Sequence, residues 1–90
     1  MTEIHVQRLN AEQFRVEVDE GASSTIHIVT ATPEDLQKYG AGGQPETLIE
    51  KSFEFLLERE PKESILRTFD LPVIERYFPN YSQVMCSRLA

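Results

Sequence analysis

The pattern of hydrophobic and polar residues changes at Thr32: the two kinds alternate before it, and hydrophobic residues recur at helical spacing after it. Alternation is typical of half-buried β-strands. It predicts strands at 3–9, 12–19 and 24–31, with alternating hydrophobic positions at Ile4, Val6, Phe14, Val16, Val18, Ile26 and Ile28. Short polar turns join these segments, so we expect an antiparallel meander with one packed face and one solvated face.

The register of the first hairpin follows from its turn. If this turn centres on Ala11, Ile4 lies opposite Val18 and His5 lies opposite Glu17. The hydrophobic pair then faces the core, and the pair of His5 and Glu17 faces solvent.

The second turn predicts a candidate metal site. If this turn centres near Ala22, Glu17 also lies opposite His27, and His5, Glu17 and His27 form a row across the solvated face. Two imidazoles and a carboxylate are a common ligand set for zinc. The alternative is charge pairing across the strands without a metal, because the two strands that flank Glu17 lie about 9–10 Å apart.

Prolines, glycines and capping residues divide the rest of the chain into helices. Thr32 can cap a short helix over 33–40, and the glycines of 40–43 form a linker. A long helix is expected over 45–60, and Pro61 stops it.

Beyond Pro61 the pattern predicts two further helical pieces. The first contains Ile65, Leu66 and Phe69, and the second follows Asp70 as its cap and closes at Pro79. The tail at 80–90 can form a frayed helix, because its hydrophobic residues fall at helical spacing: Tyr81, Val84, Met85 and Leu89.

The predicted helix over 45–60 has two opposed faces. Its hydrophobic residues spread over about half of the circumference, which is wider than the roughly 100° stripe of one contact face. We expect them to pack between the sheet and the later helices, with a homodimer interface as the alternative. On the other side Glu46, Glu50, Glu54 and Glu58 form an acidic ridge. This ridge is the candidate binding surface for a basic partner, and a solvated face screened by salt is the alternative.

These elements predict one α+β domain over residues 1–90. A three-stranded antiparallel β-meander occupies 1–31, and a helical half at 32–79 packs on one face of it. The tail at 80–90 follows.

Composition narrows the possible functions. The net charge is −6, and the Lys and Arg residues are scattered, which argues against nucleic acid as a partner. No hydrophobic run approaches the roughly 20 residues of a membrane span, and the amino-terminal residues do not resemble a signal peptide. The single cysteine, Cys86, rules out an intramolecular disulfide. A cytoplasmic setting is expected.

Catalytic chemistry has little support in the sequence. No Ser or Cys nucleophile can be placed beside an activating base, and Cys86 lies far in sequence from both histidines. Most carboxylates belong to one exposed ridge, where burial cannot tune their pKa values. We expect no catalytic residues and no cofactor.

Four segments of the second half carry a family resemblance: Ser52–Pro61, Ser64–Arg67, Phe69–Leu71 and Val73–Pro79. In these segments the chain resembles small uncharacterised bacterial proteins of similar length with a strand-rich first half. The resemblance implies a self-standing fold and a bacterial or similar cytoplasmic origin. It implies no catalytic or binding residues.

These features predict a small cytoplasmic protein-binding or regulatory module. Its expected partner is another protein or a second copy of the chain. The alternative function is a metal- or small-ligand-binding domain that uses the exposed face of the sheet.

Overall fold

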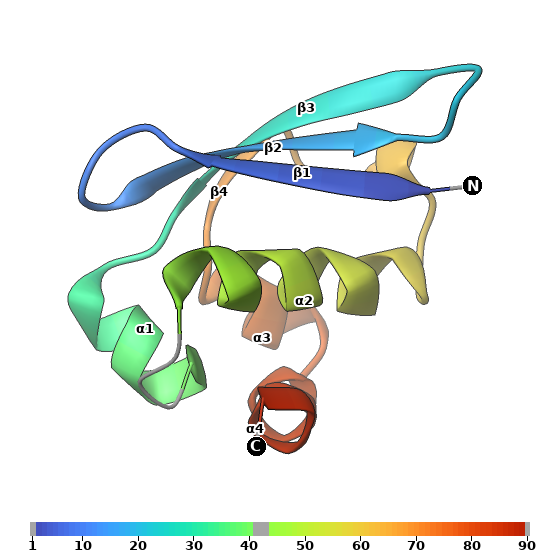
Figure 1. The fold of residues 1–90 in the computed structure, drawn as a ribbon. Coiled ribbons are helices and arrows are strands. Elements are labelled where there is room, and N and C mark those ends of the chain that lie inside the picture. The colour runs from blue at the N-terminus through green and yellow to red at the C-terminus, as the bar shows by residue number, and fades with distance from the viewer. Residues whose placement is uncertain (1, 41–43, 90) are drawn as a thin grey trace.

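The computed structural model describes residues 2–40 and 44–89, which form a four-stranded sheet with the helices on one face of it (Figure 1). The predicted α+β class is confirmed, while the linker residues Gly42 and Gly43 lie outside the described residues. None of the described helices is long and apolar enough to cross a membrane. The strands are β1 (Glu3–Arg8), β2 (Gln13–Asp19), β3 (Ser24–Thr30) and β4 (Thr68–Asp70). The helices are α1 (Pro33–Gly40), α2 (Pro45–Leu57), the 3₁₀ turn η1 (Lys62–Ser64), α3 (Val73–Tyr77) and α4 (Tyr81–Leu89).

The first hairpin has the predicted register, with Ile4 opposite Val18 and His5 opposite Glu17. Asn10 fixes its turn, because the Asn10 side-chain oxygen accepts the backbone N–H groups of Glu12 and of Gln13, the first residue of β2. The core side of β2 is fully buried at Phe14, Val16 and Val18.

The second hairpin is shifted by one residue from the predicted register. Asp19 pairs with Ser24, and the tight turn between them centres on Gly21 and Ala22. Gly21 has a φ of 89°, which glycine adopts without strain, and its N–H donates to the Asp19 side chain at 2.8 Å. Four residues separate Asp19 from Ser24, so the centre of the turn falls between Gly21 and Ala22. The prediction placed the centre near Ala22, which gives a register that differs by one residue.

This shift reverses the two faces of β3. Glu17 lies opposite Ile26, and Val16 lies opposite His27. The core side of β3 therefore consists of Thr25, His27 and Val29, while Ile26 and Ile28 lie half-buried on the outer face. Alternation could not decide the face, because β3 carries hydrophobic residues on both sides.

The segment after Pro61 contains a strand where the sequence pattern predicts a helix. β4 pairs in parallel with β3 and places Phe69 opposite Val29. The sheet is therefore mixed and four-stranded, and the prediction of three antiparallel strands was incomplete. Asp70 ends β4 and does not cap a helix, since Pro72 is the residue that precedes α3.

A long-range backbone bond explains why the helical pattern fails here. The Ile28 N–H donates to the Arg67 carbonyl at 2.7 Å, so the open edge of β3 gains hydrogen bonds from this segment. Ile65 is already extended, with φ −74° and ψ 133°. Pairing with β3 satisfies backbone groups that a short isolated helix would leave to solvent.

The predicted start of α1 is confirmed. The Asp35 N–H donates to Thr32 Oγ1 at 3.2 Å, and the Thr32 N–H donates back to the Asp35 carboxylate at 3.0 Å. α1 ends at Gly40, where an added Cβ would lie 3.3 Å from a Leu48 methyl carbon, so α1 and α2 approach closely. α2 begins at Pro45 as predicted and ends at Leu57, three residues before the predicted end.

α2 packs with two sides, as its wide hydrophobic sector predicts. Phe53 faces the sheet, where its ring centroid lies 5.3 Å from that of His27 and 6.1 Å from that of Phe69. Phe55 faces the later helices, with its ring centroid 5.8 Å from Phe78 and 5.4 Å from Tyr81. Both sides of α2 are therefore covered within the chain.

The tail is a packed helix and not a frayed one. Tyr81 and Met85 of α4 are completely buried. Ser52, which the sequence pattern did not single out, donates to the Leu48 carbonyl at 2.7 Å. Ser52 Oγ also lies 2.6 Å from the Tyr81 hydroxyl, so the tyrosine is the donor of that bond. Burial raises the pKa of Tyr81 and keeps this donor protonated.

Candidate functional site

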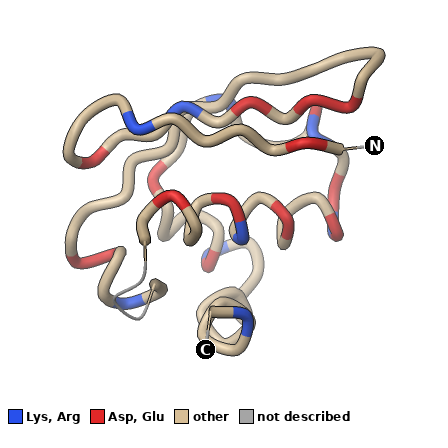
Figure 2. Tube along the Cα trace, in the orientation of Figure 1, with Lys and Arg blue, Asp and Glu red and all other residues tan. Residues whose placement is uncertain are grey.

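The open edge of β1 lies beside the acidic side of α2. β1 is the terminal strand of the sheet, and α2 runs below it (Figure 1). A groove of about 420 Å³ separates the two elements, lined by Thr2, Ile4, Leu57 and three glutamates of the predicted ridge: Glu50, Glu54 and Glu58. Figure 2 shows acidic residues along α2 beneath β1. The fourth glutamate, Glu46, does not line this groove.

Hydrogen-bond alternation shows which backbone groups of β1 point outward. The Leu9 N–H donates to the Gln13 carbonyl at 2.9 Å, so odd-numbered residues of β1 bond to β2. The even-numbered residues Ile4, Val6 and Arg8 therefore direct their N–H and C=O groups away from the sheet. This edge can accept another strand.

The ridge glutamates differ in how far other residues neutralise them. Glu58 accepts two bonds from Arg88, at 2.7 and 2.8 Å, and this contact lowers the pKa of the Glu58 carboxyl. The Glu54 carboxylate lies 3.6 Å from the Lys51 ammonium nitrogen. Within the described ranges Glu50 makes no ion pair, so negative charge is most available at the Glu50 end of the groove.

The predicted row of His5, Glu17 and His27 is not assembled. His5 and Glu17 are neighbours on the outer face of the sheet, whereas His27 lies on the core face. Both ring nitrogens of His27 already have partners, since Nε2 lies 2.7 Å from Thr25 Oγ1 and Nδ1 lies 2.7 Å from the Leu66 carbonyl oxygen. Burial in the core lowers the pKa of His27.

A different set of possible ligands occurs on the outer face. Glu3, His5 and Asp19 bring one ligand atom each within 4.8 Å of one another. Glu3 and His5 are exposed and contact each other at 3.2 Å. Metal binding on this face would therefore use Glu3 and Asp19 with His5, in place of Glu17 and His27.

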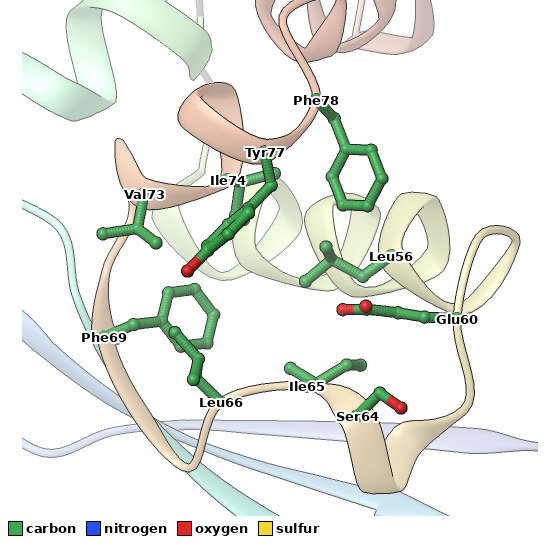
Figure 3. Close-up of a pocket in the computed structure, with 10 residues that line it drawn as sticks. All are labelled: Leu56, Glu60, Ser64, Ile65, Leu66, Phe69, Val73, Ile74, Tyr77 and Phe78. Carbon is green, nitrogen blue, oxygen red and sulfur yellow. The ribbon is translucent and has the colours of Figure 1, made fainter.

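A second groove, with mostly hydrophobic walls, lies between the η1–β4 segment and α3 (Figure 3). Its volume is about 380 Å³. One wall consists of Ile65, Leu66 and Phe69, and the other consists of Val73, Ile74, Tyr77 and Phe78. Leu66 and Tyr77 are 48% and 68% exposed, and they are two of the three exposed large hydrophobic residues among those described. Exposed hydrophobic residues gathered around a concavity are typical of binding sites.

Sequence reasoning missed this groove because it assigned its walls to the core side of helices. Phe69 belongs to strand β4, and Ile65 has an extended backbone, so neither lines the groove from a helix. The signal that could have found the groove is the run of hydrophobic residues between 65 and 78, which exceeds what two short helices can bury.

A buried lysine anchors the turn that leads into one wall of this groove. Lys62 of η1 is only 2% exposed, and its ammonium lies 2.8 Å from the Glu20 carboxylate in the β2–β3 turn. Glu63 is its second partner, and the hydrogen bonds that the Lys62 ammonium donates to these two carboxylates raise the pKa of Lys62. The contact ties η1 to the sheet and thereby positions Ser64 and Ile65.

No family model, curated protein or solved structure matches this chain. The resemblance to small bacterial proteins stays a prediction. The features of the molecule that bear on function are the two grooves and the β1 edge.

Proposed function

We propose that the chain is a small protein-binding module that accepts an extended basic segment of a partner as an additional strand beside β1. The observation that carries this proposal is the position of the open β1 edge directly beside the acidic groove. The edge supplies backbone hydrogen bonds, and the groove supplies selectivity for positive charge.

The geometry of strand addition supports this chemistry. Alternate side chains of an added strand would point to the same side as Ile4, toward α2. A Lys or Arg there can lay its hydrocarbon stem on Ile4 and Leu57 while its charged group reaches Glu50. An acidic side chain at the same position would meet like charge.

The test uses a peptide of about ten residues in which Lys alternates with Val. We expect weak binding that falls as salt is added, because the attraction between charges at the surface is screened. Glu50→Lys with Glu54→Lys should weaken binding at least about tenfold, which is about 1.4 kcal/mol. Hydrogen exchange should show new protection at the amides of Ile4, Val6 and Arg8.

The matched control is Glu12→Lys with Glu34→Lys, which changes the net charge equally at exposed positions outside the groove. This control should retain most of the binding. Equal losses in both double variants would mean that net charge alone attracts the peptide. Binding without protection of the three outward amides would also overturn strand addition.

A further inference from the structure

The hydrophobic groove has one polar end. Figure 3 shows the carboxylate of Glu60 entering the groove between Leu56 and Ile65, and Ser64 lines the same end with its hydroxyl turned away from that carboxylate. The opposite end is closed by Phe69, Leu66 and Val73 and is hydrophobic. The groove therefore matches an occupant with a hydrophobic body and one polar group.

The sign of that polar group follows from Glu60. Among the described residues Glu60 has no ion-pair partner, and its neighbour Arg59 is engaged elsewhere. Arg59 donates to the Phe55 carbonyl and to Glu58, and its guanidinium lies 3.6 Å from the centroid of the Phe55 ring. A carboxylate beside hydrophobic walls is stabilised by a positive, hydrogen-bonding group.

The groove is held in shape before anything binds. His27 donates to the Leu66 carbonyl from the core side, and Lys62 anchors the turn that precedes Ile65. The first contact holds the backbone of the wall at Leu66, and the second holds the turn that leads into the same wall. A preformed wall lowers the ordering cost of binding.

The dimensions indicate a small molecule. A volume of about 380 Å³ lies near the lower end of small-molecule sites, which span roughly 300–1,000 Å³. The exposed rims, Leu66 and Tyr77, can cover a ring that enters between them, while Phe69 and Phe78 offer aromatic contacts.

We propose that this groove binds a small primary amine carried on an aromatic or branched hydrocarbon body. The ammonium group pairs with Glu60, and the hydrocarbon body packs between Phe69 and Tyr77. This site is independent of the β1 edge and goes beyond the proposed function.

The test compares three probes of similar shape by nuclear magnetic resonance titration: 2-phenylethylamine, 2-phenylethanol and 3-phenylpropanoate. The amine should bind at least about tenfold more tightly than the alcohol, and the carboxylate should bind least. Shift changes should map to residues 64–78. Glu60→Gln should remove the preference for the amine and leave the alcohol almost unaffected.

Two further variants locate the interaction. Glu12→Gln removes one exposed carboxylate outside the groove and should leave the affinities for all three probes unchanged. Leu66→Ser, at a half-exposed rim position, should lower the affinities for the amine and for the alcohol by similar factors.

Several results would overturn the proposal. These are equal affinity for amine and alcohol, a preference that survives Glu60→Gln, shifts confined to β1 and α2, or no binding at millimolar amine. Shifts confined to β1 and α2 would contradict the amine site and leave the proposal for the strand edge standing.

Discussion

His27 is held as a neutral imidazole with one defined tautomer. The Leu66 carbonyl can only accept, so Nδ1 carries the proton, and Nε2 then accepts from the Thr25 hydroxyl. Burial is the main cause of the lowered pKa, and the positive charge of Arg67 adds to it, while the bond to Leu66 opposes it. The folded protein therefore resists protonation of this ring.

This resistance predicts a loss of stability in mild acid. Below the ordinary histidine value of 6.5 the unfolded chain takes up a proton that the folded chain does not bind. The free energy of unfolding should therefore fall with decreasing pH, by up to about 1.4 kcal/mol per pH unit, until the lowered pKa is reached. Urea unfolding between about pH 7.5 and pH 5 measures this slope.

His27→Gln should flatten that slope. At neutral pH it should also cost about 1–3 kcal/mol, because the buried Thr25 hydroxyl and the Leu66 carbonyl lose their imidazole partner. His5→Gln is the matched control, since it removes the other histidine from an exposed position and should leave the slope in place. If His5→Gln flattened the slope and His27→Gln did not, the acid sensitivity would belong to His5 and the prediction would be contradicted.

The side of the sheet on which His27 lies could not be predicted from alternation. Ile26 and Ile28 favour one face of β3, and Val29 favours the other. The deciding feature is the Gly21-Ala22 turn, whose conformation depends on backbone angles that a hydrophobic pattern does not carry. By contrast, Ile4 and Val18 were paired correctly, because one face of β2 is clearly hydrophobic and the other is polar.

α4 stabilises the molecule by covering the side of α2 that faces away from the sheet. Met85→Ala should cost about 2–5 kcal/mol in the free energy of unfolding, since it removes a completely buried side chain. Thermal or urea unfolding measures the change.

Gln83→Ala, at an exposed position of the same helix, should change stability by less than about 0.5 kcal/mol. A frayed tail would make both substitutions nearly neutral, so similar small values would contradict the packed helix.

Helices with clear end signals were predictable, and β4 was not. Thr32, Pro33 and Pro45 act through local bonds and fixed dihedral angles, so the sequence alone places both helix starts. β4 has three residues, which is too few for a periodic pattern, and its partner strand lies about forty positions earlier. The hydrophobic groove depends on β4 and was missed with it. The acidic ridge is visible in the sequence because its glutamates recur every four residues along α2, up to Glu58 at the C-terminal cap.

The molecule as a whole carries a net charge of −6, which affects any pairing between copies. If two copies joined through their β1 edges, the glutamates of both grooves would lie near one junction, because each α2 lies beneath its own β1. Like charges there oppose association.

Self-association through β1 should therefore increase with salt, whereas binding of a basic segment should decrease. Sedimentation equilibrium at about 0.05 M and about 0.5 M salt distinguishes the two. Dimers that are strongest at low salt would place the contact between copies elsewhere on the surface.

The parallel pairing of β3 with β4 also governs the order in which the chain can fold. The bond from His27 to Leu66 spans 39 positions, so it closes a long loop, while both hairpins close short ones. The meander can form early, with Ile26 and Ile28 on its outer face and the β3 edge still open. Until the segment at 65–70 arrives, the β3 edge is open to pairing with a neighbouring chain, as the β1 edge is.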